Sequence, residues 1–252
     1  MRRLGVLTPS SNTVLEPLTS RLAEPLADRL GIHFTRVPVT AIADAPASHE
    51  QFSPRAMVDG ARLLADARVD AMLWGGTSGA WEGIQADRDI VAAIGEATGI
   101  PATTATLALL EALRVLGVRR YALVVPYAEP IADAITANLE REGYACVARS
   151  FDSITVNWDF AAISGAEIAQ RVRTVARSRP DAVIIHCTNL RGAEVAGRLE
   201  RQLEMPVLDS VVVGLWGALR VLHLATPAGF GRLAGAGAQG VPSPASSVDP
   251  DA

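Results

Sequence analysis

The chain has 252 residues, a formal net charge of -4 and 49% hydrophobic residues, which suits one large folded domain or two small ones. The acidic balance offers no basic surface for nucleic acid, and no apolar run reaches the roughly 18 residues that a membrane helix needs. All 23 basic residues are arginine, and the absence of lysine excludes enzymes that use a lysine Schiff base, a P-loop lysine or a kinase lysine.

Short apolar runs alternate along the chain with stretches of helical periodicity. The clearest helical stretches are residues 13–30, 54–67 and 167–177. The predicted strands, in chain order, are residues 4–8, 32–38, 70–74, 101–103, 121–125, 145–149, 181–186 and 207–209. This alternation predicts an α/β fold in which helices cover both faces of parallel sheets.

The second part of the chain weakly repeats the first. Residues 2–9 resemble residues 119–126, residues 70–77 resemble 181–188, and a third pair of similar segments starts at Pro101 and Pro206. Three matches in the same order indicate a duplicated α/β half-unit with a pseudo-twofold axis and a ligand cleft between the halves. We assign residues 1–114 plus 207–233 to the first half and 115–206 to the second. The Gly/Ala/Pro/Ser-rich tail, 234–252, is expected to be disordered.

Cys187 is the first candidate for chemistry. It ends an apolar strand and precedes a turn into the next helix, where backbone N–H groups and the helix dipole favour a thiolate of lowered pKa. The strand-end position and the repeat favour this interpretation over a buried structural thiol. The repeat makes Gly76 the partner of Cys187 across the axis. Cys146 lies within a strand-like run and is interpreted as core.

Hydroxyl and amide groups follow the other predicted strands. Thr77 and Ser78 lie in a glycine-rich loop whose backbone N–H groups suit a carboxylate, although a plain turn is an equal alternative. Ser11 and Asn12 are candidate caps of the following helix, and Asn12 could equally face the cleft. Tyr127 either donates a hydrogen bond to an oxyanion or packs in the core.

The four histidines are scattered and no CxxC or HExxH motif occurs, so no metal site is predicted. His186 is next to Cys187 on a predicted strand, so its side chain should point to the opposite face, and we interpret it as structural. His49 lies in the long loop 41–53, which is a candidate cover for the cleft.

Two cysteines and no secretory signal predict free thiols in a cytoplasmic protein.

Taken together, these motifs resemble the aspartate/glutamate racemase superfamily, and within it the maleate isomerase and arylmalonate decarboxylase branch, over about residues 3–220. The resemblance rests on residues 9–12 (PSSN), 76–79 (GTSG), 126–127 (PY), 157 (N) and 187–191 (CTNLR). It implies two Rossmann-like parallel-sheet halves with the active site in the cleft between them, and chemistry that uses neither a cofactor nor a metal.

Racemases and maleate isomerases of this superfamily have a cysteine in each half, whereas arylmalonate decarboxylases have glycine in the first half. Gly76 stands at that first position, so the resemblance implies a cofactor-independent decarboxylase of a small malonate-type or related dicarboxylic acid. Cys187 would protonate the resulting enediolate. The residues implied to bind the substrate carboxylate are Asn12, Ser11, Thr77, Ser78, Tyr127, Asn157 and Thr188.

Two alternatives stay open at this point. The loop residues are closer to those of maleate isomerases, so the chain is alternatively a maleate cis–trans isomerase or an Asp/Glu/hydantoin-type racemase that replaces the missing thiol. A carboxylate-binding relative without catalysis is the second alternative. The expected partner is a small carboxylate, with neither nucleic acid nor membrane, and a homo-oligomer is an open possibility.

Overall fold

A computed structural model describes residues 1–43 and 46–236 of the chain. Its eight strands within these residues form two four-stranded parallel sheets of the same strand order. The first sheet has the order β2 (Leu30–Val37), β1 (Arg2–Pro9), β3 (Ala71–Trp74) and β4 (Ala102–Thr104). The second has the order β6 (Ala145–Ser150), β5 (Arg120–Val124), β7 (Ala182–Ile185) and β8 (Val207–Asp209). The predicted α/β fold and duplication are confirmed, because each strand has a counterpart at the same place in the other sheet.

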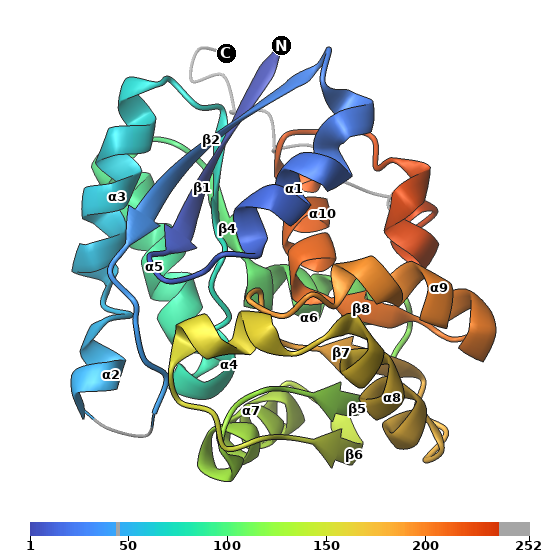
Figure 1. Cartoon of the computed structure of the whole chain (residues 1–252). Coiled ribbons are helices and arrows are strands. Elements are labelled where there is room, and N and C mark those ends of the chain that lie inside the picture. The colour runs from blue at the N-terminus through green and yellow to red at the C-terminus, as the bar shows by residue number, and fades with distance from the viewer. Residues whose placement is uncertain (44–45, 237–252) are drawn as a thin grey trace, which may run out of the picture.

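Helices connect the strands and cover the sheets (Figure 1). The long ones are α1 (Leu15–Ala23), α3 (Pro54–Asp66), α5 (Ile84–Thr98), α6 (Ala105–Val115), α7 (Glu129–Arg141), α8 (Gly165–Ala176), α9 (Ala193–Leu203) and α10 (Ser210–Val221). The short ones are α2 (Pro46–Glu50), α4 (Gly79–Glu82) and the 3-10 helices η1 (Glu24–Leu26), η2 (Asn157–Ala162) and η3 (Ala228–Ala234). No helix in the described ranges is both long and apolar enough to cross a membrane.

The predicted helix 13–30 is too long. Its α-helical part ends at Ala23, a 3-10 turn follows, and Leu30 already belongs to β2. Pro25 explains the end of the helix, because proline has no N–H to donate to the preceding turn.

The core strands explain why the sheets form. β3 and β7 are buried along their whole length, with the sequences AMLW and AVII. Continuous apolar runs of this kind are typical of parallel strands that helices cover on both faces.

The two halves meet along α6 and α10, which follow the last strand of each sheet and pack against each other (Figure 1). Gly217 of α10 permits this contact, since a Cβ at that position would lie 2.5 Å from Cβ of Ala108 in α6. α10 also packs on β3 and β4, as expected for a segment returning to the first half.

The assignment of residues 207–209 to the first half is wrong, because β8 pairs with β7 in the second sheet. Of the tail 234–252, residues 237–252 lie outside the described residues, and Ala234 ends η3.

Candidate active site

A small cavity lies at the carboxyl ends of the central strands, where open α/β sheets bind ligands. It measures about 10 Å³, which is about the size of one water-sized sphere. It is lined by Pro9, Val39, Ile42, Phe52, Gly76, Thr77, Trp81, Tyr127, Asn157, Cys187 and Thr188. Both halves contribute, so folding brings together residues that lie far apart in the sequence.

Gly76 and Cys187 occupy equivalent places in the two halves. Each stands two residues beyond the end of its strand, β3 and β7 respectively, and both line the cavity. The two positions that the repeat pairs therefore both lie at the cavity. Cys146 is the second residue of the edge strand β6 and is absent from the cavity lining.

The Cys187 thiol is 2% exposed. Burial raises its pKa to about 12, against the opposing effects of the Tyr127 hydroxyl and the backbone N–H groups of Asn189 and Leu190. The predicted lowering of this pKa is therefore wrong, because removing the thiolate from water raises the pKa by more than these hydrogen bonds lower it. The arrangement makes Cys187 a proton donor rather than a ready nucleophile.

Thr77 and Tyr127 join the two halves beside this thiol. The Thr77 Oγ1 and Tyr127 Oη atoms are 3.0 Å apart, and the Tyr127 hydroxyl also interacts with Cys187. Burial raises the pKa of Tyr127 well above its usual value, so the phenol keeps its proton. A hydroxyl, a phenol and a thiol thus lie in sequence along one wall of the cavity.

Thr188 and Asn12 form a second connection between the halves. The Thr188 hydroxyl donates to the Gly75 carbonyl at 2.7 Å and accepts from Asn12 Nδ2 at 3.1 Å. Oδ1 of Asn12 accepts the backbone N–H groups of Val14 and Leu15 at the start of α1. Asn12 therefore caps the start of α1, as the sequence suggested, and also orients Thr188, which lines the cavity.

Asn157 and Ser11 lie on the same side of the cavity. Nδ2 of Asn157 donates to the Ser11 hydroxyl at 2.7 Å, and that hydroxyl donates to the Val39 carbonyl at 2.6 Å. Nδ2 of Asn189 in turn donates to the Asn157 carbonyl at 2.6 Å. Asn157 lines the cavity, whereas Ser11 does not and is connected to it through its hydrogen bonds to Asn157 and Val39.

Ser78, like Ser11 and Asn12, is a predicted site residue that does not line the cavity. Its hydroxyl accepts the indole N–H of Trp74 at 3.2 Å, and it is absent from the cavity lining. The turn into α4 directs Ser78 back towards β3, which the sequence pattern does not reveal.

The segment after β2 covers the cavity, as the loop length suggested. Val39, Ile42 and Phe52 line the cavity from this segment. An isolated antiparallel bridge pairs Ala41 with Val156 of the second half. A backbone hydrogen bond from the Ile42 N–H to the Thr155 carbonyl, at 2.8 Å, joins the same two segments.

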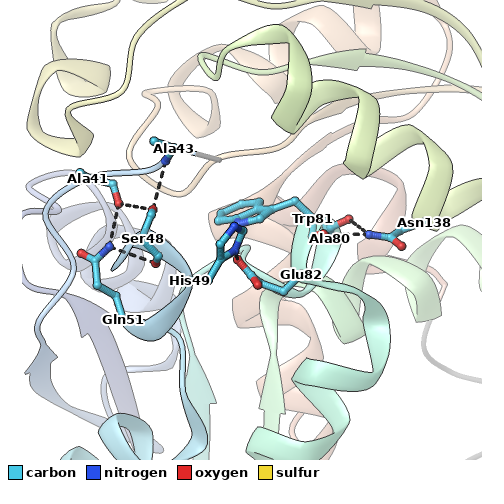
Figure 2. Close-up of polar contacts among 9 residues, drawn as sticks. All are labelled: Ala41, Ala43, Ser48, His49, Gln51, Ala80, Trp81, Glu82 and Asn138. Atoms are coloured by element: carbon cyan, nitrogen blue, oxygen red, sulfur yellow. Dashed lines mark hydrogen bonds and ion pairs between the residues drawn. The ribbon is translucent and has the colours of Figure 1, made fainter. Parts of the chain in front are cut away.

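Polar contacts tie the short helix α2 to Glu82 of α4 and to the Ala41 carbonyl (Figure 2). Nδ1 of His49 lies 2.6 Å from Oε1 of Glu82, and the Ser48 and Gln51 side chains both donate to the Ala41 carbonyl. From the second half, Asn138 of α7 donates to the Ala80 and Trp81 carbonyls. His49 therefore anchors the cover and does not line the cavity.

Aromatic rings, which the sequence reading missed apart from Tyr127, pack in an edge-to-face chain through the site. Ring centroids are 5.6 Å apart for Phe52 and Trp81, 5.1 Å for Trp81 and Tyr127, and 5.3 Å for Tyr127 and Phe160. Only the position of Phe52 in the long loop hinted at such a role. Phe52, Trp81 and Tyr127 line the cavity, and Phe160 packs against Tyr127 without lining it.

His186 lies outside the cavity lining, with its Nδ1 3.3 Å from the Ser210 hydroxyl. Burial lowers the pKa of His186 to about 4, so the ring is neutral. Among the described residues, no three His, Cys, Asp or Glu side chains gather in a way that suits a metal ion.

Comparison with known proteins gives consistent matches. The family model described as arylmalonate decarboxylase matches residues 41–234. A maleate isomerase of Nocardia farcinica is 28% identical, over 92% of this chain and 95% of that protein. An arylmalonate decarboxylase of Bordetella bronchiseptica is 30% identical, over 70% of this chain and 76% of that protein. A solved structure of a Nocardia farcinica maleate cis-trans isomerase mutant, with a covalently bound succinylcysteine intermediate, has a TM-score of 0.83 at 26% identity and covers 92% of this chain and 98% of its own.

Proposed function

Because the chain belongs to the arylmalonate decarboxylase family, within the aspartate/glutamate racemase superfamily of enzymes, we propose that it decarboxylates a small malonate-type dicarboxylic acid without a cofactor. The observation that carries this proposal is the single protonated thiol of Cys187, which faces a first half that offers Gly76 and no second thiol. A decarboxylase of this kind needs one proton donor, whereas a two-base racemase needs a group in each half.

The polar wall suits the carboxylate that the product retains. Thr77 and Tyr127 present hydroxyl groups to the cavity, and the raised pKa of Tyr127 keeps its phenol a donor. Thr188 and Asn157 extend this wall, positioned by Asn12 and Ser11. As the C–C bond breaks, its electron pair moves into an enediolate on the retained carboxylate, and donors aimed at those oxygens stabilise the developing charge.

The apolar wall suits the rest of the substrate. Among the described residues lining the cavity, none is arginine or histidine, and Val39, Ile42, Phe52 and Trp81 are apolar. An apolar surrounding destabilises the departing carboxylate and favours its loss as neutral CO2. This lining favours a malonate with an apolar or aromatic substituent over maleate, which keeps both of its carboxylates.

Cys187 completes the reaction as general acid. Its S–H transfers a proton to the enediolate carbon, and solvent returns a proton to the thiolate before the next turnover. A covalent route through Cys187 would require a thiolate in the resting enzyme, and burial opposes that state. Because the cavity measures about 10 Å³, we propose that the covering segment around Val39 and Phe52 moves when substrate enters.

The test is a screen of 2-methyl-2-phenylmalonate, maleate and amino-acid derivatives, reading CO2 release and product chirality together. We expect CO2 release from the malonate and none of the maleate converted to fumarate. Cys187→Ala should lower kcat by about 10²–10⁴-fold, while Cys146→Ala, which removes the cysteine outside the cavity, should keep it. Conversion of maleate without CO2 release, or wild-type turnover by Cys187→Ala, would refute the proposal.

A further inference from the structure

The indole ring of Trp74 occupies the space that the Cβ atom of any side chain at position 76 would need. A Cβ built on Gly76 would lie 2.9 Å from Nε1 of Trp74, and Cε2 and Cζ2 of the same ring would be closer still. The three nearest atoms all belong to Trp74. Real Cβ atoms do not tolerate such approaches, so any side chain at position 76 must displace the ring.

Trp74 has little freedom to move aside. It is 0% exposed, it ends β3, and β3 lies between β1 and β4. Its indole N–H donates to the buried Ser78 hydroxyl at 3.2 Å. Rotating the ring would break this bond and require repacking of a core that is already dense.

We infer that Trp74 is a specificity-determining residue: its indole keeps position 76 without a side chain and commits the cavity to proton delivery from the Cys187 side alone. This inference rests on the proposed function for its stereochemical consequence. An enediolate is planar, so a donor on one side gives one enantiomer of a chiral product, and a second thiol on the other side allows loss of chirality by exchange.

Trp74 and Gly76 therefore form a coupled pair. Restoring a thiol by Gly76→Cys in the presence of Trp74 brings a clash instead of a second acid. Shortening the tryptophan vacates the volume that the new side chain needs. Ser78 has its place in this pair too, because it holds the indole rather than the substrate.

The experiment is a double-mutant cycle of Gly76→Cys and Trp74→Leu in the full chain, with Trp74→Phe as the milder variant if the leucine protein does not fold. Trp216→Leu is the matched control, because Trp216 is equally buried, in α10, and is not among the atoms nearest to position 76. The first readout is Tm. The second is solvent deuterium exchange at the α-carbon of 2-phenylpropionate, with the enantiomeric excess of the decarboxylation product.

We expect Gly76→Cys alone to lower Tm by about 2–10 °C, and this cost to shrink or vanish beside Trp74→Leu but not beside Trp216→Leu. The double variant should exchange deuterium about 10²-fold faster than wild type and give product of lower enantiomeric excess. An equal Tm cost in all three backgrounds, or fast exchange by Gly76→Cys alone, would overturn the inference. The Tm cycle uses no substrate, so failure of every variant to release CO2 would count against the proposed function and not against the coupling.

Discussion

Cys187 should stay protonated far above neutral pH, and this can be measured directly. With a pKa of about 12, the thiolate fraction at pH 8 is about 10⁻⁴, against about 10⁻¹ for an ordinary value of 9.0. Thiolate is the species that iodoacetamide alkylates. Cys187 should therefore react about 10³-fold more slowly than an unperturbed thiol at pH 8.

The assay follows alkylation by mass spectrometry between pH 7 and pH 11. Cys146→Ser leaves Cys187 as the one thiol of the chain, and Cys187→Ser provides the matched protein with Cys146 alone. The rate at Cys187 should rise about tenfold per pH unit without a plateau through pH 10, and should become ordinary in 8 M urea. Burial also slows alkylation by keeping the reagent away from the thiol, so a slow rate does not by itself show a raised pKa. The dependence of the rate on pH distinguishes the two causes. A plateau below pH 9 would refute the reasoning and restore the thiolate expected from the sequence.

Three further predictions concern residues around the thiol. Tyr127→Phe keeps the packed ring but removes the hydroxyl that contacts Thr77 and Cys187, so kcat should fall by about 10²-fold with Tm nearly unchanged; wild-type kcat would exclude the phenol from the mechanism. Between pH 6.5 and pH 4 the unfolded chain binds a proton at His186 that the folded chain does not, so stability falls as the pH drops through this window. Urea unfolding at several pH values should show that His186→Gln removes up to about 3 kcal/mol of this loss, and an unchanged slope would contradict it. Asn12→Ala should lower the free energy of unfolding by about 1–2 kcal/mol, because it removes the acceptor for the N–H groups at the start of α1 and the donor to Thr188. Asn12→Asp should restore the stability that comes from capping α1 but not the part that comes from the bond to Thr188.

The site depends on contacts between the halves more than on either half. Thr77 of the first half meets Tyr127 of the second, and Asn12 of the first meets Thr188 of the second. These bonds lie in a buried, low-dielectric region, where a satisfied polar network is strong and a broken one is costly. The same contacts that align the halves therefore also orient the groups proposed to act on the substrate.

Local sequence was sufficient for the strands, the repeat and the list of polar candidates. Apolar runs bounded by turn residues mark the buried parallel strands, so all eight predicted strands are found, and Gly76 and Cys187, which the repeat pairs, both line the cavity. Tertiary structure alone decided the environment of those groups. The pKa of Cys187 rises because distant segments exclude water from it, and the Ser78 hydroxyl turns away because it accepts the indole N–H of Trp74 from the preceding strand. Burial and partner choice depend on residues far away along the chain, and no local pattern encodes them.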